Sequence, residues 1–279
     1  TNRGSKGGAL NYEHVVDVHG FSLTNAHGWS GDNRHRRHHD GLEREVAGAL
    51  EDGGLRTHRA EATKSRLARE LPTGPGFDSW RRAPVKGVAA RAILPDIVVE
   101  LRGRKDELGD AKGPGDLWLE IKTLGKQAAY ISGNHSQQHA VRKRQAEIAD
   151  EYDAKAEAAD KKFYPNYPGT PFADMISSKP RVRGLVFGMY GDWSPDVDQT
   201  IKFAAACQAE QWALRCGLPA EDALQACTWR LKRRLGFTLL RGNARKRIDC
   251  AHHVRWDGAP TLRIAPVTWG ADGWPVAQY

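Results

Sequence analysis

The sequence predicts an α/β fold in which a mixed central sheet is flanked by helices, with extra helices towards the carboxyl terminus. Two segments, around residues 97–101 and 116–123, alternate apolar and polar side chains with the period of a β-strand. A third segment, 182–191, is an apolar run of the kind found in a buried strand. Helical patterns precede, separate and follow these segments. The predicted order is therefore helix, strand, strand, helix, strand, helix.

The amino-terminal part predicts an extension followed by two helices. Residues 1–39 are rich in Gly, Asn, His and basic residues, with at most a short strand within 11–23. Asp40 is a suitable N-cap for a helix over 40–52, which has Leu42, Val46 and Leu50 on one stripe. A basic helix is expected over 57–71, ending before Pro72, and 72–80 is expected to be a loop.

The central part predicts two strands joined by a long connection. In the first strand Ile97, Val99 and Leu101 alternate. A charged Gly- and Pro-rich stretch, 103–115, follows. The second strand then divides its side chains between two faces, with Leu117, Leu119 and Ile121 on one face and Trp118, Glu120 and Lys122 on the other.

The carboxyl-terminal half is mostly helical in pattern. Residues 136–163 contain no Pro or Gly and predict one long helix with a thin apolar stripe, Val141, Ile148, Tyr152 and Ala159. A Pro-rich loop is expected over 164–172. Ser194 caps a helix that runs to about Cys216, and two further helices are expected over 219–236 and 239–254.

Composition limits the classes of function. No run of about 18 apolar residues is present, so no membrane span is expected. The 4 cysteines lie far apart without a C-x2-C pair, which argues against a cysteine zinc site and favours a reducing compartment. The histidines at 27, 35, 38 and 39 have no zinc spacing and alternate with arginines. We expect phosphate contacts or a solvated loop there.

The net charge of +8 is concentrated near the carboxyl terminus. From Arg230 to Arg255 the sequence has nine Lys and Arg residues and one acidic residue, Asp249. A localised positive segment of this kind is typical of a protein that binds a polyanion, above all a nucleic acid.

Three charged residues fall on the two central strands. Glu120 and Lys122 share a strand face, and Asp96 begins the preceding strand after Pro95. If the strands pair antiparallel, Asp96 approaches Glu120, and two carboxylates at short distance favour a divalent cation between them. Oxygen ligands prefer Mg²⁺ or Mn²⁺, and a neighbouring lysine can orient water or stabilise charge on a phosphate. This set predicts metal-assisted hydrolysis of a phosphodiester.

The segments "LPDIVVEL" and "LWLEIKTLG" resemble the PD-(D/E)XK superfamily of restriction-like endonucleases. The resemblance implies that Asp96 and Glu120 bind the metal and that Lys122 is the catalytic lysine. It also implies a further acid from the first helix, Glu43, with Glu45 as the competitor. The gap between Asp96 and Glu120 is longer than in compact members, so Asp110 or Asp116 replaces Asp96 if the register differs.

The segments "AVRKRQAEIADEYDAKAEAADKKF" and "VRGLVFGMYGDWSPDV" are similar to the carboxyl-terminal endonuclease region of non-LTR retrotransposon reverse-transcriptase proteins. The absence of a starting Met fits a piece of such a protein. We expect an extension (1–39), a nuclease-like core (40–216) and a basic helical region with a tail (217–279). An intracellular location, nuclear in a eukaryote, is also expected.

The expected partner is DNA, with RNA or a fused reverse-transcriptase domain as further possibilities. Candidate backbone contacts lie just after the second strand, in the long helix and in the last helices: Lys126, Arg142, Lys143, Arg144, Arg230, Lys232, Arg233, Arg234, Arg245, Lys246 and Arg247. The sequence therefore predicts a Mg²⁺- or Mn²⁺-dependent DNA endonuclease. The alternatives are a catalytically inactive nucleic-acid-binding module with a nuclease fold, or a repair or recombination nuclease.

Overall fold

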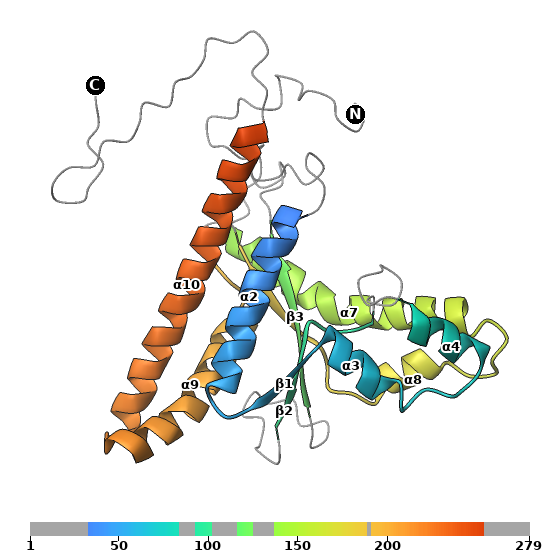
Figure 1. Ribbon diagram of the computed structural model, residues 1–279, viewed down its shortest axis with the longest axis horizontal. Coiled ribbons are helices and arrows are strands. Elements are labelled where there is room, and N and C mark those ends of the chain that lie inside the picture. Colours follow the sequence, from blue (N-terminus) through green and yellow to red (C-terminus); the bar gives the residue numbers. More distant parts are fainter. Residues whose placement is uncertain (1–32, 84–92, 102–115, 125–136, 189–190, 254–279) are drawn as a thin grey trace, which may run out of the picture.

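A mixed four-stranded sheet lies at the centre of the chain (Figure 1). The computed structural model describes residues 33–83, 93–101, 116–124, 137–188 and 191–253. The strands lie in the order β1 (Arg56–Arg59), β2 (Ile97–Glu100), β3 (Asp116–Thr123) and β4 (Arg183–Phe187). The pairs β1–β2 and β2–β3 are antiparallel, and β3–β4 is parallel. The predicted α/β class with a mixed sheet flanked by helices is confirmed.

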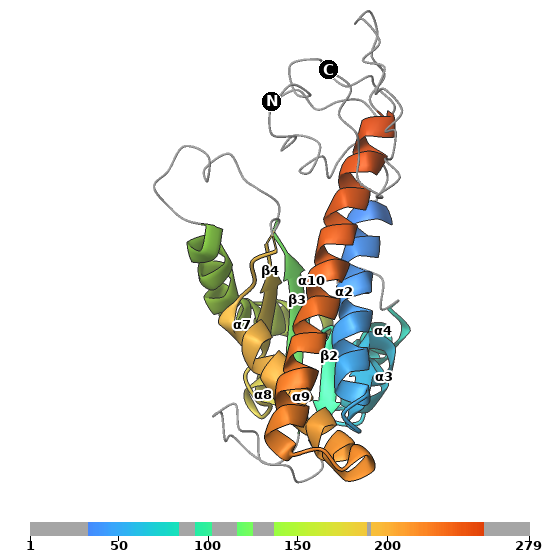
Figure 2. The same ribbon diagram turned by 90° about the vertical axis from the view of Figure 1, so that its left-hand side faces the viewer.

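Helices cover both faces of this sheet (Figure 1). The helices on one face are α2 (Asn33–Glu51), α9 (Pro195–Cys216) and α10 (Ala220–His253). Those on the other are α3 (Ala60–Leu67), α4 (Pro75–Arg82), α7 (Gln137–Phe163) and α8 (Pro171–Ser177). The view turned by 90° shows α10 running beside α2 (Figure 2). No described helix has the length and apolar character needed to cross a bilayer.

The predicted alternation of β3 divides the interior into two cores. Leu117, Leu119 and Ile121 pack with α2, α9 and α10. Trp118 packs with Val98 of β2 and with side chains of α4, α7 and α8. Because the period of a strand is two, Glu120 belongs to the same side as Trp118. The predicted side-chain directions of β3 are confirmed, as are the long helix over α7, the buried strand β4 and the start of α9 after Ser194. The Ser194 hydroxyl donates to the carbonyl oxygen of Gly184 in β4 and makes no hydrogen bond that caps the helix.

Two boundaries near the amino terminus differ from the sequence prediction. The first helix begins at Asn33, so Asp40 lies inside α2 and does not cap it. The segment expected to be one basic helix over 57–71 divides into β1 and α3. Strand β1 pairs with β2 from Arg56–Glu100 to Arg59–Ile97. This tertiary hydrogen bonding outweighs the local helical pattern.

Three further predictions are corrected in the helical regions. The segment 72–80, expected to be a loop, contains most of helix α4, which begins at Pro75 and buries Trp80. The Pro-rich loop predicted over 164–172 is confirmed as far as Thr170, after which helix α8 begins at Pro171 and buries Phe172. Proline suits the first turn of a helix, where its missing N–H has no partner to lose. The two predicted last helices form the single helix α10, because buried Leu235 and Leu239 continue one stripe across Gly236.

Gly184 of β4 allows α7 to lie close to the sheet. An added Cβ there would lie 2.5 Å from Cδ1 of Ile148 and 3.3 Å from the backbone of Gln145. Gly184 also pairs with Glu120 in the β3–β4 register. The same close approach therefore brings α7 over the part of β3 that carries the buried carboxylate.

We expect Gly184→Ala to lower the free energy of unfolding by about 1–3 kcal/mol, because the added methyl group overpacks the contact with α7. Urea denaturation followed by circular dichroism measures this change. Gly236→Ala is the matched control. An added Cβ at this helical position has no atom within 4 Å, apart from its chain neighbours and nearby helix backbone. There we expect a gain of about 0.5–1 kcal/mol. Equal effects of both substitutions would contradict the close-approach explanation.

Candidate metal centre

The β2–β3 register brings the two predicted strand carboxylates together. Ile97 pairs with Leu119, and continuing this antiparallel register by one residue places Asp96 opposite Glu120. Residues opposite each other in an antiparallel pair share a face of the sheet. Both side chains are buried, with 3% of Asp96 and 5% of Glu120 exposed. The antiparallel pairing on which the sequence prediction depended is thus present.

Asp96 is fixed by hydrogen bonds from two directions. The backbone N–H of Ile121 donates to its Oδ2 at 2.8 Å, and Nε2 of His39 lies 3.1 Å from the same oxygen. Burial alone raises the pKa of a carboxyl group, but the hydrogen bond and charge of His39 oppose it. With further help from the Ile121 N–H and the Lys122 charge, the pKa of this group falls to about 2. Asp96 is therefore a carboxylate at neutral pH.

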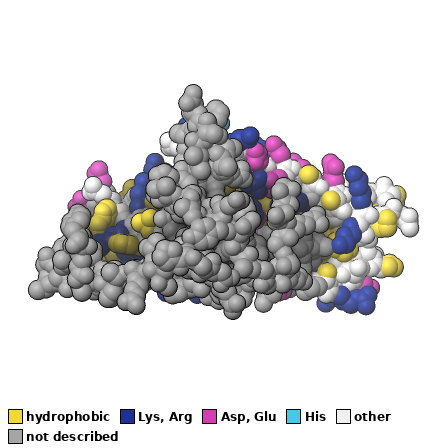
Figure 3. Space-filling view, turned by 90° about the horizontal axis from the view of Figure 1, so that it is seen from above, with side chains coloured by type: hydrophobic (Ala, Val, Ile, Leu, Met, Phe, Trp, Pro, Cys, Tyr) yellow, Lys and Arg dark blue, Asp and Glu magenta, His cyan; other side chains and the backbone are white. Residues whose placement is uncertain are grey.

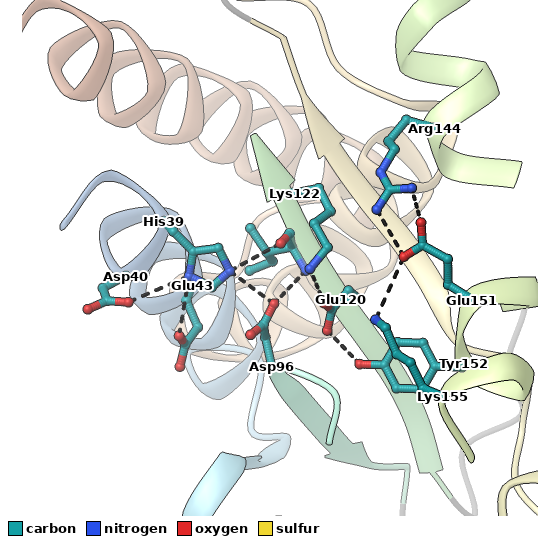
Figure 4. A network of polar contacts seen from close by, with 11 residues as sticks. His39, Asp40, Glu43, Asp96, Glu120, Lys122, Arg144, Glu151, Tyr152 and Lys155 are labelled. Atoms are coloured by element: carbon teal, nitrogen blue, oxygen red, sulfur yellow. Dashed lines mark hydrogen bonds and ion pairs between the residues drawn. The ribbon is translucent and has the colours of Figure 1, made fainter. Parts of the chain in front are cut away.

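His39 reaches the strands from α2. Its Nε2 lies 3.1 Å from Asp96 Oδ2 and 3.1 Å from the carbonyl oxygen of Ile121. Both atoms are acceptors, so Nε2 carries the proton in this arrangement. The other ring nitrogen, Nδ1, lies 3.5 Å from Asp40 and 3.9 Å from Glu43. The imidazole is thus surrounded by oxygen atoms of α2, β3 and the start of β2 (Figure 4).

Glu43 lies one helical turn after His39 and faces the same cluster. Burial raises the pKa of Glu43, and the negative charge of Asp96 raises it further. The positive charges of His39 and Arg59 only partly offset these effects. The Nε of Arg59 lies 3.7 Å from Glu43 Oε1. A second negative charge beside Asp96 is therefore unfavourable in this fold when no cation is bound.

His39, Glu43 and Asp96 form a group that can hold a metal ion. One ligand atom from each lies within 4.8 Å of the others. The group offers an imidazole nitrogen and two carboxylates, and the like-charge repulsion between the carboxylates is what a divalent cation relieves. Among the described residues, this is the one group of three or more such side chains with that geometry.

Glu120 has different partners from Asp96. The hydroxyl of Tyr152 in α7 donates to its Oε2 at 2.6 Å, and Lys122 Nζ donates to its Oε1. Tyr152 is 1% exposed, whereas 31% of the Lys122 side chain is exposed. A buried carboxylate needs such partners to offset its lost hydration. The Asp96 carboxylate lies between His39 and Glu120 in Figure 4.

The polar network continues along α7 (Figure 4). Glu151, next to Tyr152, accepts hydrogen bonds from Arg144 and lies 3.7 Å from Lys155. The hydrogen bond from Arg144 is the main cause of the lowered pKa of Glu151, to which the charge of Lys122 also contributes. A row of alternating charges therefore begins at Lys122 and extends over the outer side of the cluster.

The structure distinguishes between the alternatives that the sequence left open. Asp116 lies opposite Glu100 at the other end of the β2–β3 pair and forms an ion pair with Arg66. It does not replace Asp96, and Asp110 lies outside the described residues. On α2, Glu43 faces the cluster, whereas Glu45 forms an ion pair at 2.6 Å with Arg234 of α10.

Sequence reasoning missed two residues of this site. The sequence predicts phosphate or solvent contact for His39, because the histidines of 27–39 have no zinc spacing and lie among arginines. Because α2 begins at Asn33, earlier than predicted, His39 and Glu43 lie four residues apart on one helical face. The sequence places Tyr152 only in the apolar stripe of α7. In the structure its hydroxyl donates a hydrogen bond to Glu120, which lies 32 residues earlier in the chain. Sequence periodicity does not encode that contact.

The predicted nucleic-acid contacts lie in two separate places. Arg142 and Lys143 of α7 are exposed, while Arg144 is engaged by Glu147 and Glu151. Lys126 lies outside the described residues, as do the side chains of Lys246 and Arg247. The remaining five, Arg230, Lys232, Arg233, Arg234 and Arg245, lie on α10.

We expect Glu43→Gln to stabilise the metal-free protein. Because the folded-state pKa of Glu43 is raised above 4.5, its protonated form contributes stability at low pH. That contribution is lost as pH rises through the folded pKa. The variant should therefore melt at a higher temperature than the parent at about pH 7 in EDTA, with little difference near pH 4.

Glu45→Gln is the control for this measurement, because it weakens the ion pair with Arg234 and should give no such gain. Thermal denaturation followed by circular dichroism compares the variants. A Glu43→Gln protein that is less stable than the parent at neutral pH would contradict the proposed repulsion with Asp96.

Comparison of the chain with protein-family models, curated proteins and solved structures finds no match in any of the three.

Proposed function

We propose that this protein is a metal-dependent DNA endonuclease that hydrolyses phosphodiester bonds at the ends of β2 and β3. The observation that carries the proposal is the position of Asp96. It is ionised and buried, lies opposite Glu120 in the strand register and is within 4.8 Å of ligand atoms of His39 and Glu43. Lys122 adds a partly exposed ammonium group to the same end of the strands.

The residues present fit a divalent cation. Asp96 and Glu43 supply oxygen ligands, and His39 supplies a nitrogen. Burial, together with the charge of Asp96, raises the pKa of Glu43. When bound, the cation supplies a Lewis acid that activates water and neutralises charge on a phosphate. Glu120, which lies opposite Asp96 in the strand register, adds a further carboxylate beside these ligands.

The protein's own groups have separate roles in the proposed reaction. Lys122, held by Glu120, orients the attacking water and stabilises negative charge on the phosphate. Tyr152 acts through Glu120, because its hydroxyl fixes the carboxylate that positions the lysine. Exposed Arg142 and Lys143, on the first turns of α7, are suitable for contact with the phosphate backbone.

The wider assignment rests on sequence resemblance together with the arrangement of the sheet. The sheet has three antiparallel strands, β1 to β3, and a fourth strand, β4, parallel to β3, with helices on both faces. This arrangement is compatible with a restriction-endonuclease-like core, in which Asp96, Glu120 and Lys122 are the motif residues. The proposed setting is the target-cleaving domain of a retroelement protein. Its positive charge suits a polyanionic substrate.

Cleavage of supercoiled plasmid in Mg²⁺ or Mn²⁺ tests the proposal. We expect Asp96→Asn and Lys122→Ala each to lower the nicking rate by at least about 100-fold, because each loses a group that stabilises the transition state. DNA binding, measured by fluorescence anisotropy, should remain near the parent level. Asn retains an oxygen that accepts the Ile121 N–H, so Asp96→Asn limits damage to the fold.

Lys202→Ala, which removes an exposed lysine of α9, is the matched control and should cleave at the parent rate. Full activity in either site variant would refute the endonuclease proposal. Binding without cleavage in the parent protein, under every metal condition, would instead favour an inactive nucleic-acid-binding module.

The nitrogen of His39 favours Mn²⁺ over Mg²⁺, because Mg²⁺ prefers a shell of oxygen ligands. We expect Mn²⁺ to raise the melting temperature at lower concentration than Mg²⁺ does. The stabilisation should reach about 2.7 kcal/mol at 100 times the Kd. His39→Ala should remove most of the Mn²⁺ preference. His58→Ala, which removes a histidine paired with Glu100, should not. An unchanged Mn²⁺ response in His39→Ala would exclude His39 as a ligand.

A further inference from the structure

Helix α10 has two chemically different faces. Ala223, Cys227, Leu231, Leu235 and Leu239 recur every four residues and are at most 2% exposed. This stripe packs against α2 and α9. This stripe buries only one side of α10, because residues three or four apart share a face of a helix.

The basic residues beside this stripe are matched by acids of α2, of the turn after α2 and of α9. Arg234 pairs with Glu45 at 2.6 Å and with Asp52 at 3.0 Å. Lys232 pairs with Asp198 at 2.9 Å. The Arg230 guanidinium lies 4.0 Å from Asp52 and over the ring of Trp212. These three cations of the predicted nucleic-acid contacts therefore attach α10 to the body of the protein.

The opposite side carries what we call the aromatic–arginine face, made up of Trp229, Arg233, Phe237 and Leu240. Its apolar members are 63%, 60% and 52% exposed, in chain order. The guanidinium carbon of Arg233 lies 5.1 Å from the ring centroid of Trp229 and 5.5 Å from that of Phe237. The arginine thus lies between two exposed rings. Large exposed aromatic side chains that cluster in this way mark an interaction surface.

The charge around this face is mainly positive, and among the described side chains the exposed acids on α10 are Glu221 and Asp222 in its first turn. No Asp or Glu occurs in the sequence from Ala223 to Arg245. Arg233, Arg241 and Arg245 are exposed, and none of them forms an ion pair within the described part of the chain. Seen from above, hydrophobic and basic side chains lie together at the left, with a few acidic side chains at their edge (Figure 3). The face therefore favours an anionic partner that also offers flat apolar surfaces.

We propose that the aromatic–arginine face binds single-stranded nucleic acid, with unpaired bases stacked on Trp229 and Phe237 and phosphates beside the arginines. Unpaired bases offer π-faces that stack on aromatic side chains and on guanidinium planes. Bases within a duplex are already stacked on each other. A second copy of this face fits less well, since in a two-fold antiparallel arrangement centred on Arg233 this arginine would meet its own copy. This surface is independent of the proposed cleavage site.

Binding of a fluorescently labelled oligothymidylate of about 15 nucleotides, measured by anisotropy in EDTA, tests this proposal without any cleavage. Trp229→Ala and Phe237→Ala should each weaken binding by about 5- to 100-fold, the equivalent of one stacked base. Trp229→Phe should retain most of the affinity. Arg233→Ala should weaken binding. It should also reduce the slope of log affinity against log salt concentration by about one, because one counterion fewer is released.

Leu214→Ala is the matched control, because it removes an apolar side chain that is 87% exposed on α9. It should bind like the parent protein. All substituted side chains are exposed, so equal melting temperatures will show that the variants fold.

Three results would overturn the proposal: equal or tighter binding of a duplex of the same length, unchanged affinity in Trp229→Ala, or a dimer in sedimentation that Trp229→Ala dissociates. The last result would make the face an interface between copies of the chain. Failure of the cleavage proposal is separate, since it is measured with Asp96→Asn and in the presence of metal.

Discussion

The antiparallel pairing of β2 with β3 is the constraint on which the rest of the structure depends. Its register, Ile97 with Leu119, decides that Asp96 lies opposite Glu120 and beside the Ile121 N–H. A shift by one residue would move the side chains of one strand to the other face of the sheet. The two apolar cores enforce this register, because Leu119 and Ile121 must face α2 and α9 while Trp118 faces α7. Hydrophobic packing thereby positions a charged site that is costly by itself.

The site places several carboxylates in or near the protein interior, where unpaired charge lowers stability. Each buried carboxylate is held by a different element, Asp96 by His39 and a β3 amide, and Glu120 by Tyr152 and Lys122. Glu43 remains unfavourable beside Asp96, as its raised pKa reflects. Concentration of like charge at one point is characteristic of sites built to bind a cation, where stability is exchanged for affinity. This is the physical basis of the proposed metal-dependent function.

The basic residues of α10 have two roles. Arg230, Lys232 and Arg234 face acids of α2, of the turn after it and of α9, and hold the long helix in place. Arg233 points the other way, between Trp229 and Phe237. The net charge of segment 230–255 therefore overstates the number of cationic side chains that can contact a polyanion. Only the geometry separates structural cations from those that can meet a ligand.

The sequence by itself determined the alternation of β3, the long helix α7, the buried strand β4 and the proximity of Asp96 to Glu120 once antiparallel pairing was assumed. These follow from periods of 2 and 3.6 residues, which are local properties. The tertiary structure alone decided that 56–59 is a strand, that His39 and Glu43 join Asp96, and that Tyr152 binds Glu120. Those outcomes depend on contacts between groups 32 to 57 residues apart. No short-range pattern specifies such contacts, because they arise only when the two cores pack against the sheet.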